Sequence, residues 1–138
     1  AGSPRGGPSV VTPNENELAE AVGLTVPVPI DLAADAARRL VARGAERAVA
    51  TLGERGLVGV HETRAFTARP PRVEGNPAGA GDAVVAVVAG GLLAGDTWPD
   101  VLRRAGATAA AAVRSPVAGV VDPDDVAGLL PHVEVQEL

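Results

Sequence analysis

The chain has 138 residues, a hydrophobic fraction of 46% and a formal net charge of −5. A chain of this length buries about two thirds of the surface that its unfolded form exposes, so one domain with a real core is expected. All its cations are arginines, and Phe66 and Trp98 are its only aromatic residues. Without a basic stripe or aromatic stacking surfaces, the chain is a poor candidate for binding nucleic acid or an anionic membrane.

Cysteine is absent from the sequence, which excludes disulfides and thiolate metal sites and agrees with a reducing, cytoplasmic location. The longest apolar run, residues 83–95, predicts a buried core helix because it is too short to span a bilayer. Residues 1–8 have the glycine and proline content of a flexible segment and lack the apolar stretch of a signal peptide. We therefore expect one domain over residues 9–138.

The first third of the chain predicts one strand and two helices. Asn14 and Glu17 lie three residues apart at the start of the first helix, and their simplest interpretation is an N-cap with its capping-box partner. The elements predicted here are a strand over 9–12, a helix over 14–22 that Gly23 ends, and a helix over 32–43 that Asp31 caps.

A sheet with an antiparallel edge is predicted next. Two apolar runs flank the turn at Gly53 to Gly56, where a two-residue link between glycines indicates a hairpin-like connection. The predicted strands span 47–52, 57–61 and 63–68. Following a strand and two helices, they indicate the second half of an α/β sheet whose edge has turned antiparallel.

The glycine-rich segment 76–82 (NPAGAGD) precedes the apolar run, and we expect a helix to begin at its acid, Asp82. Two glycines around an alanine let a backbone loop approach a ligand closely, and the N–H groups of a helix start attract anions. Asp82 has two interpretations: a general base beside a bound phosphate, or a first-turn acid that favours the helix dipole. The elements predicted after it are helices over 98–113 and 123–130, capped by Thr97 and Asp122, and a strand over 133–135.

Three ordered blocks resemble successive motifs of the PfkB (ribokinase-like) sugar kinases. They are residues 11–18 (VTPNENEL), 51–56 (TLGERG) and 76–83 (NPAGAGDA). The resemblance implies a ribokinase-like three-layer α-β-α sandwich, of which this chain is the C-terminal, nucleotide-binding portion. The Pro-Asn-x-x-Glu-Leu block and a later Ser-Pro-Val-Ala-Gly make it most similar to the 1-phosphofructokinase and tagatose-6-phosphate kinase branch.

The resemblance assigns roles to individual residues. Asp82 is implied to be the general base, with Gly79, Ala80 and Gly81 forming an anion hole. The pair Asn14 and Glu17 is implied to help place Mg²⁺ through water. The ATP-binding residues implied are Thr51, Gly53 and Gly56 at the phosphates and sugar, Asn76 near the cation and phosphates, and the helix around Ala107 to Ala111 beside adenine.

The sequence also departs from the family pattern. Thr12 stands where the family usually has Lys, and Asn76 where many relatives have Asp, which weakens the expected electrostatics of the cation and phosphate site. The family's N-terminal half is absent from the sequence given, including its Gly-Gly motif, its sugar-contacting Asp and Arg residues and its lid. We expect the chain to associate with such a half or to form a homo-oligomer, because its missing neighbours leave an apolar sheet edge.

The function implied is ATP-dependent phosphoryl transfer to a hydroxyl of a sugar phosphate, with fructose 1-phosphate as the first candidate. Alternatives within the family are 6-phosphofructokinase, tagatose-6-phosphate kinase or another sugar kinase. A catalytically incomplete nucleotide-binding or scaffolding domain is the alternative outside catalysis, and we expect the chain alone to be inactive. An oxidoreductase is disfavoured because no Gly-x-Gly-x-x-Gly opens a βαβ unit.

Overall fold

The computed structural model describes residues 9–138, so the flexible segment predicted for 1–8 lies outside the described residues. The described residues form a five-stranded sheet in the order β1-β2-β3-β4-β5. β1 runs parallel to β2, and each later neighbour is antiparallel, which confirms the predicted mixed sheet. The strands are β1 (Val10–Val11), β2 (Arg47–Thr51), β3 (Leu57–His61), β4 (Arg64–Arg69) and β5 (Glu134–Glu137).

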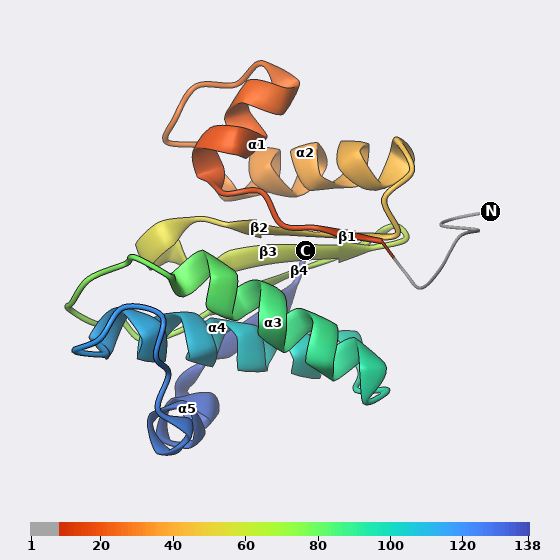
Figure 1. Cartoon of the computed structure of the whole chain (residues 1–138). Coiled ribbons are helices and arrows are strands. Elements are labelled where there is room, and N and C mark those ends of the chain that lie inside the picture. The colour runs from red at the N-terminus through yellow and green to blue at the C-terminus, as the bar shows by residue number, and fades with distance from the viewer. Residues whose placement is uncertain (1–8) are drawn as a thin grey trace.

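Helices cover both faces of this sheet, which gives the expected three-layer sandwich (Figure 1). One face carries α1 (Glu15–Val22) and α2 (Ile30–Ala42), and the other carries α3 (Ala80–Leu93), α4 (Trp98–Arg114) and α5 (Pro123–Leu129). Two short 3-10 turns, η1 (Gly53–Arg55) and η2 (Leu130–His132), complete the described elements. No helix within residues 9–138 is both long enough and apolar enough to cross a membrane.

The two faces of the sheet bury different cores, because successive strand residues point to opposite sides. In β2, Ala48 and Ala50 face α1 and α2, whereas Val49 faces α4. The first core is dominated by small side chains, and the second contains Phe66, Trp98 and Leu102. A Cβ at Gly59 of β3 would lie 2.4 Å from Leu102 Cδ2. Glycine at this position therefore lets α4 lie close against the sheet.

Two predicted helix starts are wrong. Asp31 does not cap α2, because the helix already begins at Ile30 and the carbonyl of Pro29 accepts the Ala33 N–H at 2.8 Å. The proline supplies no side-chain cap, but its fixed φ places the chain at the entry to the helix. α3 begins at Ala80 rather than at Asp82. The other predicted elements are present with ends shifted by up to two residues, and the caps predicted at Asn14, Thr97 and Asp122 are confirmed.

Candidate active site

The N-terminus of α3 is open. Gly79 occupies its N-cap position in the left-handed region, with φ 84°, and no side chain caps the helix. A Cβ at Gly79 would lie 2.9 Å from the Gly119 nitrogen and 3.1 Å from Gly119 Cα, so the loop after α4 crosses directly against this turn. Asp82 lies in the first turn of α3 and is exposed. Its carboxylate therefore stands beside a helix start that attracts anions.

The backbone amides of the predicted anion hole differ in their availability. The Ala80 N–H already donates to the Pro77 carbonyl at 3.2 Å. Gly81 and Asp82 follow it in the first turn, where N–H groups have no acceptor within the helix. A Cβ at Gly81 would meet no atom within 4 Å. The space next to the Gly81 Cα, where a side chain would begin, is therefore free for a ligand.

The loop before α3 is held against the end of α4. The Asn76 N–H donates to the Val113 carbonyl at 2.9 Å, and a Cβ on the preceding Gly75 would lie 1.9 Å from that same oxygen. The Asn76 side-chain oxygen accepts the Ala78 N–H at 3.0 Å. Asn76 thus shapes the loop that leads to Gly79, with one lone pair of its side-chain oxygen already in use.

The N-terminus of α1 is closed by its own residues. Asn14 Oδ1 accepts the Glu17 N–H at 2.8 Å, and Glu17 Oε1 accepts the Asn14 N–H at 3.0 Å. This reciprocal capping box is the simplest interpretation of the pair, and it is confirmed. Among residues 9–138 no group of three or more acidic or histidine side chains is placed to hold a metal ion. A cation near Asn14 and Glu17 would thus depend mainly on water and ligand oxygens.

The turn at Thr51 to Gly56 lies beside the start of α1. The Thr51 N–H donates to the Pro13 carbonyl at 3.0 Å, and Thr51 pairs with Asn14 in an isolated parallel bridge. Gly56 has φ 89°, and a Cβ there would lie 2.2 Å from the Ala68 carbonyl oxygen. The fold therefore brings the first two sequence blocks into direct contact.

The sequence of the chain matches the model of a known protein family. The model of the pfkB family carbohydrate kinases matches residues 4–125, which is most of the chain. The chain belongs to this family.

Relatives and solved structures agree with the pfkB assignment. The chain is 33% identical over 130 residues to 1-phosphofructokinase of Escherichia coli K12, covering 94% of this chain and 41% of that protein. It is 37% identical over 130 residues to the bifunctional protein HldE of Bradyrhizobium sp. ORS 278, covering 91% of this chain and 26% of that protein. The structure of Escherichia coli phosphofructokinase-2 in complex with potassium matches with TM-score 0.81 and 27% identity, covering 89% and 40% of the two chains. The pfkB chain described here thus spans less than half the length of these relatives.

The three sequence blocks gather at one end of the pfkB fold. Figure 1 shows η1, the loop before α3 and the loop after α4 at the same end of the molecule. Two predicted residues do not offer a surface there: Ala107 and Ala111 are 0% and 1% exposed, within the core between α4 and the neighbouring elements. Their small side chains let helices approach each other, and in this structure a purine has no access to them.

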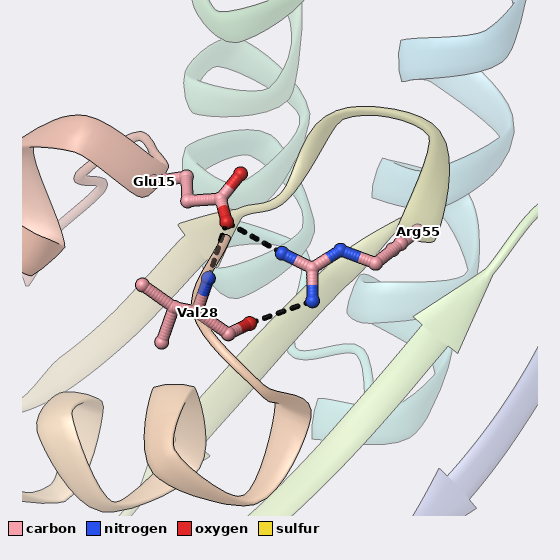
Figure 2. A network of polar contacts seen from close by, with 3 residues as sticks. All are labelled: Glu15, Val28 and Arg55. Carbon is pink, nitrogen blue, oxygen red and sulfur yellow. Dashed lines mark hydrogen bonds and ion pairs between the residues drawn. The ribbon is translucent and has the colours of Figure 1, made fainter. Parts of the chain in front are cut away.

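A polar network that the sequence did not predict lies beside the site. Glu15, which directly follows Asn14, pairs with Arg55 of η1 at 2.6 Å, and both bond to the backbone of Val28 (Figure 2). Opposite charges inside two of the three sequence blocks were the available signal. Charge alone does not identify the partner, because the described residues include many other exposed Glu and Arg side chains.

Proposed function

We propose that this chain is the nucleotide-binding half of an ATP-dependent kinase that phosphorylates a hydroxyl of a sugar phosphate, with fructose 1-phosphate giving the 1,6-bisphosphate as the first candidate. The observation that carries the proposal is the uncapped start of α3, with space above Gly81 and the exposed Asp82 in its first turn. Membership of the pfkB family and the likeness to 1-phosphofructokinase support it.

The reaction uses Asp82 as a base and the α3 amides as an anion hole. Asp82 accepts the proton of the sugar hydroxyl as its oxygen bonds to the γ-phosphorus of ATP. The bond from that phosphorus to the bridging oxygen of ADP breaks, so one phosphoryl group moves and one proton is released to the carboxylate. The N–H groups of Gly81 and Asp82 offset the charge on the transferring phosphoryl group without a lysine.

The nucleotide lies between the remaining blocks in this proposal. Thr51, Gly53 and Gly56 contact its phosphates and ribose from the turn, and Asn76 approaches from the loop before α3. Mg²⁺ bound with ATP neutralises phosphate charge. The lone pairs that the capping box leaves free on Asn14 and Glu17 suit the second coordination sphere of such an ion, where water carries the contact.

An acceptor half is needed beside this chain. β1 has only two residues and one neighbour in the described sheet, and Val11 on it is 37% exposed. On α3, Val85 is 44% and Leu93 is 90% exposed, and no charged residue follows Asp82 on that helix. We propose that the N-terminal half of a pfkB kinase covers this edge and helix. A second copy of the chain is the alternative partner, since one solved relative is a tetrameric inhibited form of phosphofructokinase-2.

Calorimetry of the 138-residue chain tests the nucleotide half of the proposal. We expect heat on titration with MgATP and none with fructose 1-phosphate, fructose 6-phosphate or tagatose 6-phosphate, because the acceptor side is contributed by other residues. The chain could also bind MgATP and yet show no turnover after an acceptor half is added. That pair of results would favour a non-catalytic nucleotide-binding domain. Absence of nucleotide heat would contradict the proposal.

Turnover in the complete kinase that contains this chain tests the base. Asp82→Asn is nearly isosteric but cannot accept the proton, so we expect kcat to fall by about 10³-fold or more while the affinity for MgATP changes little. Asp100→Asn is a matched control, since Asp100 is also an exposed first-turn acid, at the start of α4. Undiminished turnover of Asp82→Asn would exclude it as the base.

A further inference from the structure

Glu15, Val28 and Arg55 form a closed ring of polar contacts, here called the Glu15 clasp (Figure 2). Glu15 Oε2 accepts the Val28 N–H at 2.7 Å and an Arg55 Nη2–H at 2.6 Å. Arg55 Nη1 donates to the Val28 carbonyl at 2.6 Å. One carboxylate oxygen and one guanidinium group thus satisfy both backbone groups of Val28.

The clasp joins three segments that are distant in sequence. Glu15 is the first residue of α1, Arg55 is the last residue of η1, and Val28 lies in the connection between α1 and α2. The Val28 side chain is fully buried in the core beneath α1 and α2. Because the Val28 side chain is closely packed in the core, its backbone is held in place, and the ring is anchored to a rigid part of the molecule.

Backbone bonds fix the shape of the turn and, through the Thr51 N–H and the Pro13 carbonyl, connect its first residue to the segment before α1. The Leu52 N–H donates to the Gly56 carbonyl at 2.8 Å, and the Gly56 N–H donates to the Gly53 carbonyl at 3.0 Å. Both bonds lie within the turn itself. Arg55 reaches out of the turn and connects it to α1, while the neighbouring Gly53 and Glu54 are exposed.

The contacts of Glu15 and Arg55 are suited to holding the turn against α1. The Arg55 side chain is 34% exposed and that of Glu15 is 24% exposed, so solvent screens the pair only in part. Charge-assisted bonds of this length are stronger than neutral ones, and the planar guanidinium directs two of them at once. Arg55 Nη2 contacts the Glu15 carboxylate and Nη1 contacts the Val28 carbonyl, so Glu15 balances the charge of Arg55 and the guanidinium is engaged within the clasp.

We infer that Glu15 and Arg55 are positioning residues that hold the Gly53–Gly56 turn in register with the start of α1, so that nucleotide phosphates meet both blocks in one geometry. The inference rests on the proposed function for the ligand, but the position of the turn is a property of the chain itself. Neither residue contacts the ligand, and each acts through the glycines and through Asn14.

The first measurement is hydrogen exchange of the nucleotide-free chain. Glu15→Gln and Arg55→Gln should each lower the protection of the Leu52 and Gly56 amides by about tenfold, because the far end of the turn loses its side-chain anchor to α1. The double variant should resemble either single variant, since the pair acts as one unit. Arg55→Lys retains the charge but not the planar fork, and should fall between wild type and Arg55→Gln.

The second measurement is the affinity for MgATP at a temperature at which every variant is fully folded. We expect Glu15→Gln and Arg55→Gln to weaken binding by about tenfold. Arg64→Gln is the matched control for loss of an ion pair, since Arg64 pairs with Glu137 between β4 and β5. Leu129→Ala in α5 is the control for loss of stability, because Leu129 is 6% exposed in the other core. Neither control should weaken nucleotide binding.

The outcomes separate this inference from the proposed function. Wild-type chain that binds no MgATP contradicts the proposed function, and hydrogen exchange then decides whether the clasp positions the turn. If wild type binds MgATP while the clasp variants bind it equally well, the inference is overturned. The same holds if Leu129→Ala weakens binding as much as Arg55→Gln does, since general stability would then explain the loss.

Discussion

The helix starts of α1 and α3 both lie at the site end of the molecule, yet they are built in opposite ways. α1 is closed by the reciprocal bonds of Asn14 and Glu17, whereas α3 begins at Gly79 without a side-chain cap. A helix start leaves backbone N–H groups without partners, so a protein either satisfies them or leaves them for a ligand. The contrast is consistent with the proposal that the α3 start binds an anion while the capped start of α1 is a fixed support.

The largest expected effect on this contrast comes from Gly79→Ala. A side chain is strained at φ 84°, and its Cβ would lie 2.9 Å from the Gly119 backbone nitrogen. We expect a loss of about 2–4 kcal/mol in the free energy of unfolding, from backbone strain and overpacking together. Chemical denaturation of the chain measures it. An unchanged midpoint would show that the α3 start can relax and is not a rigid anion site.

Gly81→Ala separates an effect on ligand affinity from an effect on the stability of the fold. Its Cβ meets no atom within 4 Å, and alanine favours a helix over glycine, so stability should stay the same or rise by up to about 1 kcal/mol. The affinity for MgATP should nevertheless fall about tenfold or more, because a methyl group then occupies the space that the ligand needs. Denaturation and calorimetry on one preparation give both values. Equal affinity in the variant would place the phosphates elsewhere.

Asn14→Ala opens the closed helix start. Loss of the cap should lower the free energy of unfolding by about 1 kcal/mol, as is typical of N-caps. Asn14→Asp retains a side-chain acceptor and should keep most of that stability. Turnover of the complete kinase at varied Mg²⁺ then distinguishes the two roles of Asn14. An unchanged Mg²⁺ dependence in Asn14→Asp would leave Asn14 with capping alone.

The smallest expected effect is a pH dependence outside both helix starts. Hydrogen bonding to Arg64 lowers the pKa of Glu137 on the exposed β4–β5 edge. A carboxylate with a lowered folded-state pKa stabilises the fold above its unfolded pKa and loses that effect as pH falls through the folded value. β5 should therefore loosen first below about pH 4. In Glu137→Gln, the amide exchange rate in β5 should no longer rise as the pH falls through this range. Any acid response that remains then belongs to other elements, such as α1 and α3.

The positions of caps and turns followed from the sequence because they depend on neighbours along the chain. The bonds of Asn14, Thr97 and Asp122 each reach a residue two or three positions away, so a local pattern contains all of their partners. The same local chemistry failed at Asp31, where Pro29 had already set the entry to α2. Propensity identifies several possible starts for a helix, and the surrounding chain selects one of them.

The sequence blocks alone determined the fold class and the family, because hydrophobic periodicity and the motifs at residues 11–18, 51–56 and 76–83 are properties of contiguous residues. Only the tertiary structure decided which groups of the site are free. In the fold the Ala80 N–H is hydrogen-bonded to the Pro77 carbonyl, Ala107 and Ala111 are buried, and Glu15 pairs with Arg55. Those outcomes depend on the packing of segments far apart in the chain, where many equivalent alanines and charges compete and only three-dimensional proximity selects among them.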